Sequence, residues 1–412
     1  MNQYISINKY LPVILLYFFF NTFLLPSGLL YTTILTPFFL IWLYKFPSFQ
    51  YIGYFLLIMV PFVVIHYFNG INLNYYIRSF ILLFSVYVFS VTVYQFLKEC
   101  KSIRTLYKKL LVINSLFVIL ALLALTLPEL KAQFWYMNEI TSGINIVRLK
   151  MLTYEPSYYS ILFVPIALYY YLKIILLKLP NPIVTLLLLT IPLLLSFSFG
   201  IILGLMLSIF FTFLMQPSFY FYNKNLHVYI LSSIVIVILG IFAIQLFPNN
   251  VFVVRLENVF FGTDTSFKGR TADSFYLAWE IASKRSIWFG CGLGQVKEIG
   301  LDIFRKFYNY PLFTINQIGI PNALGDTFAT FGIVGVFIRL SLQVFFFFKT
   351  RVHTNYYRLS LFLFIFIYQF TGSYIMNIAE YVIWIMAFKQ NIFEEFSQMS
   401  IIKRNIIKQK AN

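Results

Sequence analysis

Apolar runs of about 20 residues, the length that crosses a bilayer core as a helix, recur along the whole chain and are separated by short polar connections. Each run is continuously apolar, whereas the strands of a membrane β-barrel alternate between apolar and polar residues. The pattern therefore predicts an all-α polytopic membrane protein. Twelve spans are predicted, at approximately 8–25, 28–45, 51–68, 77–98, 107–127, 155–175, 182–197, 199–216, 228–247, 324–348, 357–376 and 378–389.

Composition and charge support this assignment. Of the 412 residues, 60% are hydrophobic and 11% are charged, and the mean hydropathy is +0.81; soluble proteins carry about 25% charged residues. The net charge of +17 would suit a nucleic-acid partner. With the N-terminus inside, however, more than half of the Lys and Arg residues fall in predicted cytoplasmic segments, as the positive-inside rule requires. We expect both termini in the cytoplasm and no nucleic-acid partner.

The spans divide the chain into four regions. Residues 1–247 hold nine spans and an outside segment at about 128–154, which suits an interfacial helix or a reentrant piece. Residues 248–323 form a large extracytoplasmic loop, 324–390 hold three spans, and 391–412 form a basic cytoplasmic tail. Gly200 and Gly204 have the spacing that lets two membrane helices approach closely. Cys100 and Cys291 fall on opposite sides of the membrane, so no disulfide is expected.

The large loop contains two predicted amphipathic helices. The second covers Val296–Phe307, and the turn Gly290–Gly294 precedes it. This turn lacks the strand and helix of a dinucleotide-binding fingerprint, so it either approaches a phosphate or simply reverses the chain. The first helix covers Thr271–Arg285, with an apolar face of Phe275, Ala278, Trp279 and Ala282, and with Asp273, Glu280 and Lys284 away from that face.

Glu155 precedes Pro156, which fits the first turn of the sixth span. A carboxylate at this helix start interacts favourably with the helix dipole, by about 0.3–1 kcal/mol. A carboxylate at membrane depth, followed one turn later by Tyr158, is also how a buried general base would be placed. Both interpretations stay open.

Arg148, Arg255 and Arg270 lie beside apolar sequence near the predicted outer surface, with Lys268 close by. Guanidinium groups bind phosphate oxygens through paired hydrogen bonds and stay charged when partly desolvated. These residues suggest a site for a lipid-linked phosphate or diphosphate. Alternatively, the charges have no such role, since long loops cross the membrane whatever their charge. Arg78, at the outer edge of the fourth span, could serve the same site or extend to the lipid headgroups.

The tenth span carries polar residues at its outer end, including Asn322 and Asp326, and Arg339 lies midway along it. An unpaired charge at that depth costs several kcal/mol, so Arg339 requires a partner or an aqueous cavity. Glu380, early in the twelfth span, is a candidate partner. No cluster with metal-ligand spacing occurs in the sequence, and we expect neither a metal nor another cofactor.

Three segments together resemble a known family. GRTADSFYLAWEIASKRSIWFGCGLG at 269–294, followed by PNALGDTFATFGIVG at 321–335, is similar to the core of the O-antigen ligase and polymerase superfamily. RLKMLTYEPSYYS at 148–160 is similar to the signature of Wzy-type oligosaccharide repeat-unit polymerases. The number of predicted spans and the single large loop late in the chain also match.

Individual residues of this chain match positions of the family's motifs. Arg148 and Glu155 match the polymerase signature, and Arg270 matches the loop arginine. Asn322 matches an asparagine that follows a histidine in the family, but Pro321 occupies the histidine position here. Ligases are expected to need that histidine, so the departure favours a polymerase.

The resemblance implies a bacterial inner-membrane glycosyltransferase that joins undecaprenyl-diphosphate-linked oligosaccharides into O-antigen or capsular polysaccharide. Glu155 would act as base, Arg148 and Arg270 would neutralise the leaving diphosphate, and inversion without a metal is expected. A chain-length regulator protein is a further implied partner. The expected substrate-binding residues are Arg255, Arg78, Lys268, Tyr158, Asn322 and Asp326.

Two alternatives remain. One is a ligase that transfers glycan from undecaprenyl diphosphate to another acceptor. The other is a flippase or transporter of lipid-linked oligosaccharide. A transporter is expected to show internal repeats and charges spread through the membrane depth, whereas this sequence shows no repeat and gathers its candidate charges on the outer side.

Overall fold

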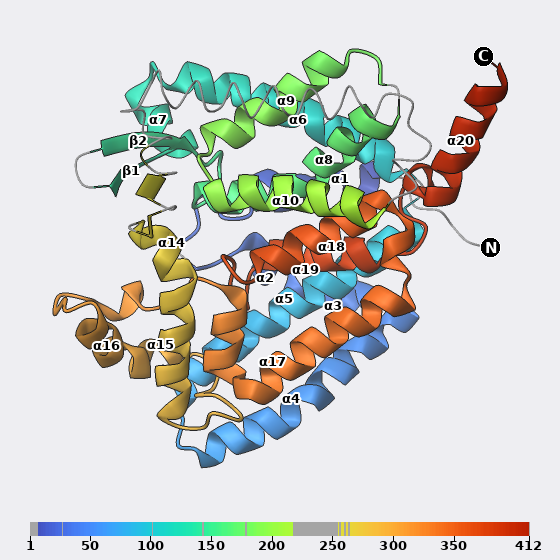
Figure 1. Ribbon diagram of the computed structural model, residues 1–412. Coiled ribbons are helices and arrows are strands. Elements are labelled where there is room, and N and C mark those ends of the chain that lie inside the picture. The colour runs from blue at the N-terminus through green and yellow to red at the C-terminus, as the bar shows by residue number, and fades with distance from the viewer. Residues whose placement is uncertain are drawn as a thin grey trace.

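The computed structural model describes residues 7–26, 28–100, 102–141, 144–177, 179–216, 254, 257–258, 261–262 and 264–411. The fold is mostly helical, at 74%, and its long helices run side by side across the molecule (Figure 1). In the first half the helices are α1 (Ile7–Leu15), the π-helical turn η1 (Leu16–Phe20), α2 (Tyr31–Ile34), α3 (Thr36–Leu43), η2 (Pro47–Phe49), α4 (Gln50–Phe68), α5 (Leu73–Glu99), α6 (Ile103–Ala124), α7 (Pro128–Phe134), α8 (Pro156–Leu176), α9 (Pro182–Leu195) and α10 (Phe199–Met215). In the second half they are α14 (Thr265–Arg270), α15 (Ala272–Ser283), α16 (Val296–Phe307), η3 (Ile315–Gln317), α17 (Ala323–Lys349), η4 (Val352–Thr354), α18 (Tyr356–Tyr368), α19 (Ile378–Phe388), η5 (Glu394–Phe396) and α20 (Gln398–Ala411).

In the part of the chain that the structure describes, five helical segments are long and apolar enough to cross a membrane, and shorter apolar helices accompany them. This is the architecture of a helical membrane protein. The predicted span 28–45 is divided into the short helices α2 and α3, the predicted span 357–376 is helical only to Tyr368, and the predicted span 228–247 lies outside the described residues. The five long segments are Pro47–Phe68, Leu73–Glu99, Ile103–Ala124, Pro156–Leu176 and Ala323–Lys349.

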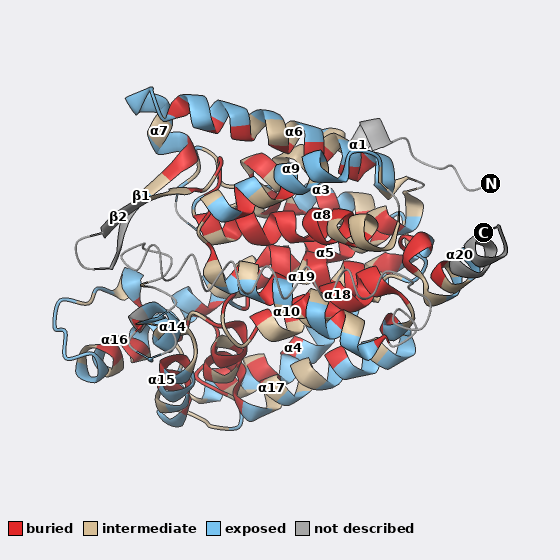
Figure 2. Ribbon diagram, turned by 45° about the horizontal axis from the view of Figure 1, so that its top comes forward, coloured by how far each residue is buried: buried red, intermediate tan, exposed pale blue. Residues whose placement is uncertain are grey.

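Helix α8 forms the centre of the bundle. Most of its residues are buried in the main hydrophobic core, together with residues of α5, α18 and α19, and Figure 2 shows the buried residues concentrated there. Helix α10 packs against α18 at Gly204, where an added Cβ would lie 3.4 Å from the Phe364 ring. The close helix approach predicted from the glycine spacing is confirmed.

The outside segment near 128–154 contains a β-hairpin, so the prediction of a wholly α-helical fold is wrong at this point. Strand β1 (Trp135–Thr141) pairs antiparallel with β2 (Ile144–Leu149), and Trp135 lies opposite Leu149. The sequence INIVRL is rich in β-branched residues, which favour strands. The Trp135 indole donates a hydrogen bond to the Ala121 carbonyl (2.7 Å) and so ties the hairpin to the end of α6.

The hairpin, α14, α15 and α16 gather at one end of the bundle, and α20 projects from the opposite end (Figure 1). We call the first of these the hairpin end. Helix α20 shows that much of the predicted basic tail is helical. At the hairpin end, Gln295 exchanges hydrogen bonds of 2.9 and 3.0 Å with the Asn72 backbone, and Arg285 donates to the Asn69 carbonyl (2.7 Å). The loop helices are thereby fastened to the connection between α4 and α5.

Both predicted amphipathic helices are present, and α16 has the predicted bounds. The buried face of α15 differs from the prediction. Asp273 is buried, whereas Phe275 and Trp279 are 37% and 49% exposed. Leu277, Ala278, Ile281 and Ala282 form the buried side, because α15 turns its smaller aliphatic residues towards α17 and leaves its large aromatic residues at the surface.

The glycine-rich turn is explained by packing. Gly290, Gly292 and Gly294 all have positive φ, a region that side chains with a Cβ rarely adopt. The Cys291 and Gly292 amides donate to the Ala329 and Thr330 carbonyls at 2.8 and 3.0 Å. A Cβ on Gly290 would lie 2.4 Å from the Thr330 backbone. The turn therefore lies directly against α17.

Candidate functional site

Glu155, Arg148 and Arg270 come from three separate segments, and the charges of both arginines act on the Glu155 carboxyl. Glu155 is the extended residue before α8, Arg148 is in β2, and Arg270 ends α14. Burial is the main influence on Glu155 and raises the pKa of its carboxyl, while the charges of Arg270 and Arg148 oppose that shift. The site therefore combines a partly desolvated carboxylate with two guanidinium groups whose charges favour its ionised form.

Arg148 is held in place by the end of α9. Its Nε atom donates to the Ser196 carbonyl (3.0 Å) and its Nη2 atom donates to the Phe197 carbonyl (3.3 Å). These carbonyls follow the last turn of α9, where helical carbonyls lack partners within the helix. The Ser196 hydroxyl in turn accepts a hydrogen bond from Ser160 of α8 (2.7 Å). The guanidinium is therefore fixed relative to the helix that Glu155 precedes.

Arg270 is positioned through its backbone. The fully buried Asn322 donates from Nδ2 to the Arg270 carbonyl (2.8 Å) and accepts the Gly325 amide (2.6 Å) as the N-cap of α17. Asn322 therefore joins α14 to α17 and holds the backbone of Arg270. The predicted role of Asn322 in substrate binding stays a prediction.

Two tyrosines that sequence analysis did not assign also border Glu155. The hydroxyls of Tyr154 and Tyr374, which we call the tyrosine pair, lie 3.1 Å apart. Burial raises the pKa of Tyr154 well above its ordinary value and that of Tyr374 to about 12, and the charge of Glu155 adds to both shifts. Yet 39% and 37% of these side chains remain exposed. Both tyrosines are therefore accessible from the surface.

Tyr158 and Asp326, both predicted to bind substrate, contact the tyrosine pair and its neighbouring backbone. Tyr158 is 2% exposed, its ring centroid is 4.8 Å from that of Tyr154, and its hydroxyl accepts from Asn21 (3.1 Å). The Asp326 carboxylate accepts a hydrogen bond from the Ile375 amide (3.0 Å). This bond holds the backbone next to Tyr374 in place. Neither contact was visible in the sequence, because the partners are distant along the chain.

A buried polar network holds the same segment from the opposite side. Arg339 pairs with Glu380, as predicted, and donates to Gln369 (2.9 Å) and to Thr327 (3.1 Å). The Glu380 carboxylate also accepts the Ser373 hydroxyl (2.6 Å). The predicted partnership is confirmed, and it links α17, the end of α18 and the start of α19.

Two predicted residues are not brought to the site. Arg78 is exposed on α5, and Lys268 is exposed on α14. Neither of them is among the charges that act on the Glu155 carboxyl. Arg255 lies outside the described residues.

Within the described ranges, no group of three or more His, Cys, Asp or Glu residues could hold a metal ion. Cys100 and Cys291 are both free thiols. Comparison with known proteins finds no matching protein-family model and no matching curated protein.

Proposed function

We propose that this protein is a polysaccharide polymerase, a glycosyltransferase that joins undecaprenyl-diphosphate-linked oligosaccharide repeat units. The observation that carries the proposal is that Arg148 and Arg270 both act electrostatically on the buried Glu155 carboxyl in an otherwise apolar bundle. One desolvated carboxylate and two guanidinium groups can deprotonate a hydroxyl and neutralise a departing diphosphate. We place the reaction at the outer face of the bacterial cytoplasmic membrane, with both termini in the cytoplasm.

In the proposed reaction, the acceptor hydroxyl oxygen attacks the anomeric carbon of the growing chain and its proton passes to the Glu155 carboxylate. The bond from the anomeric carbon to the diphosphate oxygen breaks, and the lipid diphosphate leaves with that electron pair. Burial raises the pKa of Glu155, which makes the carboxylate a stronger base, while the site keeps part of it accessible. A single displacement without an enzyme nucleophile inverts the anomeric centre.

Arg148 and Arg270 stabilise the developing negative charge on the leaving diphosphate. Preorganised donors at such a position commonly contribute about 10²–10³-fold in rate. The Arg148 guanidinium is fixed by backbone carbonyls, so it does not have to reorganise when the charge develops, and the Arg270 backbone is held by Asn322. In this proposal the two arginines supply the charge neutralisation, and the reaction needs no metal.

The decisive experiment replaces Glu155 by Gln and examines the glycan ladder of cells that carry the variant. We expect single repeat units without polymer, because Gln has the shape of Glu but cannot accept the proton. Glu298→Gln, at an exposed position of α16, is the matched control and should polymerise normally. Normal chain length in the Glu155 variant, with equal protein in the membrane, would refute the assignment of the base.

The same strains separate the polymerase from the alternatives. Polymer stranded on the undecaprenyl carrier in a strain that lacks the protein would indicate a ligase. Purified protein in liposomes that moves lipid-linked oligosaccharide across the bilayer without lengthening it would indicate a flippase. Loss of polymer with retained single repeat units supports the polymerase.

A further inference from the structure

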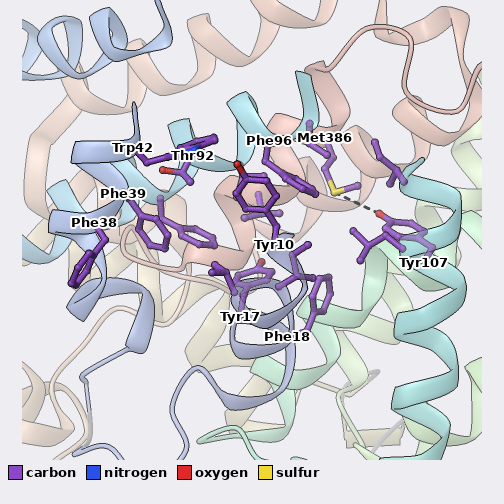
Figure 3. A pocket seen from close by; sticks show the side chains of 18 residues that line it. Tyr10, Tyr17, Phe18, Phe38, Phe39, Trp42, Thr92, Phe96, Tyr107 and Met386 are labelled. Carbon is purple, nitrogen blue, oxygen red and sulfur yellow. Dashed lines mark hydrogen bonds between the residues drawn. The ribbon is translucent and has the colours of Figure 1, made fainter. Parts of the chain in front are cut away.

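An apolar cavity of about 240 Å³ lies among α1, η1, α3, α5, α6 and α19, away from the candidate site. Figure 3 shows its walls, with Phe39 and Trp42 of α3, Phe96 of α5 and Met386 of α19 around a common space. The part of α5 that lines it is Phe89–Leu97, the last stretch of a helix whose start is fastened to the loop helices of the hairpin end. The cavity is therefore displaced towards the end of the bundle opposite the candidate site.

The walls of this cavity offer a ligand almost nothing but carbon. Two of its hydroxyl groups are already engaged by the protein. Tyr107 lies 2.8 Å from the Tyr357 hydroxyl and 3.6 Å from the Met386 sulfur, and Thr92 donates to the Val88 carbonyl (2.9 Å). Apolar cavities of this kind stay dry and bind hydrocarbons. The chemistry of the walls therefore selects a hydrocarbon chain.

The cavity is partly open, and its edge borders a surface that suits lipid contact. Phe38 lines the cavity and is 67% exposed, and Ile41 on the same helix is also 67% exposed. Large exposed apolar side chains on a helix of a membrane bundle face acyl chains. A hydrocarbon chain can thus enter from the bilayer without crossing water.

Positive charge gathers where α5 and α19 end, directly beyond the cavity. Lys98 follows the lining residue Leu97, and Lys389 comes three residues after the lining residue Met386. The Arg358 guanidinium donates to the Ala387 carbonyl (2.9 Å) and the Phe388 carbonyl (3.4 Å), directly before Lys389. Burial lowers the pKa of Lys389, and the charges of Lys98 and Arg358 lower it further. Glu99, the acid in this group, accepts a hydrogen bond from Gln95 (2.6 Å). An excess of positive charge remains and would be relieved by an anion.

We propose that the cavity binds one acyl chain of an anionic glycerophospholipid, whose phosphate lies beside Lys98 and Lys389. The apolar walls fit the chain, the opening beside Phe38 gives access from the bilayer, and the two lysines complement the headgroup. The lipid would occupy the leaflet opposite the candidate site. This proposal does not depend on the polymerase assignment.

The test measures lipid that stays with the purified full-length protein. Wild-type protein is reconstituted in equal amounts of phosphatidylglycerol and phosphatidylcholine, extracted into detergent, washed and examined by native mass spectrometry. We expect about one retained phosphatidylglycerol per chain, as one cavity with one cationic rim implies. Val93→Trp, which fills the cavity from α5, should lose this lipid. Val60→Trp, at a 57% exposed position of α4, is the matched control and should retain it.

The headgroup contact is tested separately. In the double variant Lys98→Gln and Lys389→Gln, a lipid should still bind, but the preference for phosphatidylglycerol should fall roughly tenfold or more, as expected from the loss of two charges near a membrane surface. If Val93→Trp fails to elute as a folded species, Val13→Phe fills the same cavity with a smaller change. A wild-type protein without retained lipid, cavity-filling variants that retain as much as wild type, or an unchanged headgroup preference would each overturn the proposal.

Discussion

Breaking the ion pair between Arg339 and Glu380 should destabilise the protein strongly and should also disturb the candidate site. Glu380 is 1% exposed, and the side chain of Arg339 is 14% exposed. In Arg339→Met, the Glu380 carboxylate stays buried with the Ser373 hydroxyl (2.6 Å) and the Trp384 indole (3.2 Å) as its described partners. Removing one partner of a buried pair costs about 3–5 kcal/mol.

The double variant Arg339→Met with Glu380→Leu should regain most of the stability that Arg339→Met loses. Replacing both partners of a buried ion pair by apolar residues of similar volume is often neutral or stabilising. The loss in Arg339→Met therefore reflects an orphaned charge, and the coupling between the two substitutions should amount to several kcal/mol. Because the pair also holds the segment that carries Tyr374, polymer synthesis should recover less completely than stability does.

Stability is measured as reversible unfolding of the purified protein in detergent, for wild type, both single variants and the double variant. Polymer length in cells is the second readout. Arg351→Met, at an exposed position beyond the end of α17, controls for the same change outside the network. Two results would show that Arg339 and Glu380 are not a coupled buried pair. One is a decrease below about 1 kcal/mol in the free energy of unfolding of Arg339→Met. The other is a decrease in the double variant that equals the sum of the decreases in the two single variants.

Three further predictions concern the site itself. Arg148→Ala and Arg270→Ala should each lower the rate of polymerisation about 10²-fold or more, measured with purified protein and lipid-linked repeat units. Lys297→Ala, on the exposed side of α16, should have no effect. Equal activity in all three variants would exclude the diphosphate role. Since the pKa of Glu155 is raised, polymerisation should fall as the pH drops through that raised pKa. The contribution of Glu155 to stability should show the opposite trend, because it is greatest below the pKa of the unfolded carboxyl and declines as the pH rises through the pKa of the folded one. Glu155→Gln should remove this decline. Tyr374→Phe breaks the tyrosine pair and should cost about 0.5–1.5 kcal/mol of stability and lower activity; an unchanged rate would separate the pair from catalysis.

Several elements could be predicted because their signals are local. The bounds of α16 follow from helical periodicity within twelve residues. The pairing of Arg339 with Glu380 follows from the cost of an unpaired charge in an apolar span, since few acids lie at comparable depth. The grouping of Glu155 with Arg148 and Arg270 is predicted from a resemblance of short motifs, and in the structure the charges of both arginines act on the Glu155 carboxyl.

Other features depend on contacts between distant segments. The hairpin was missed because its strands lie in a segment whose aromatic residues suited an interfacial helix. The buried side of α15 is set by packing against α17, and sequence periodicity could not distinguish a face of Phe275 and Trp279 from one of Leu277 and Ile281. The tyrosine pair joins residues 220 positions apart, and no pattern along the chain marks such a contact.

Glu155 and Arg270 are supported by different kinds of segment. Glu155 directly precedes α8, the most buried of the long apolar helices, so the carboxylate has a rigid support. Arg270 ends the short helix α14, whose Phe267 and Lys268 are exposed, and its backbone is held to α17 by Asn322. In the proposed reaction, a rigid base at Glu155 and a charge on the surface segment α14 would allow substrate to approach from the loop side. Changes in α14 should therefore alter which lipid-linked unit is accepted, whereas changes at the start of α8 should abolish the reaction.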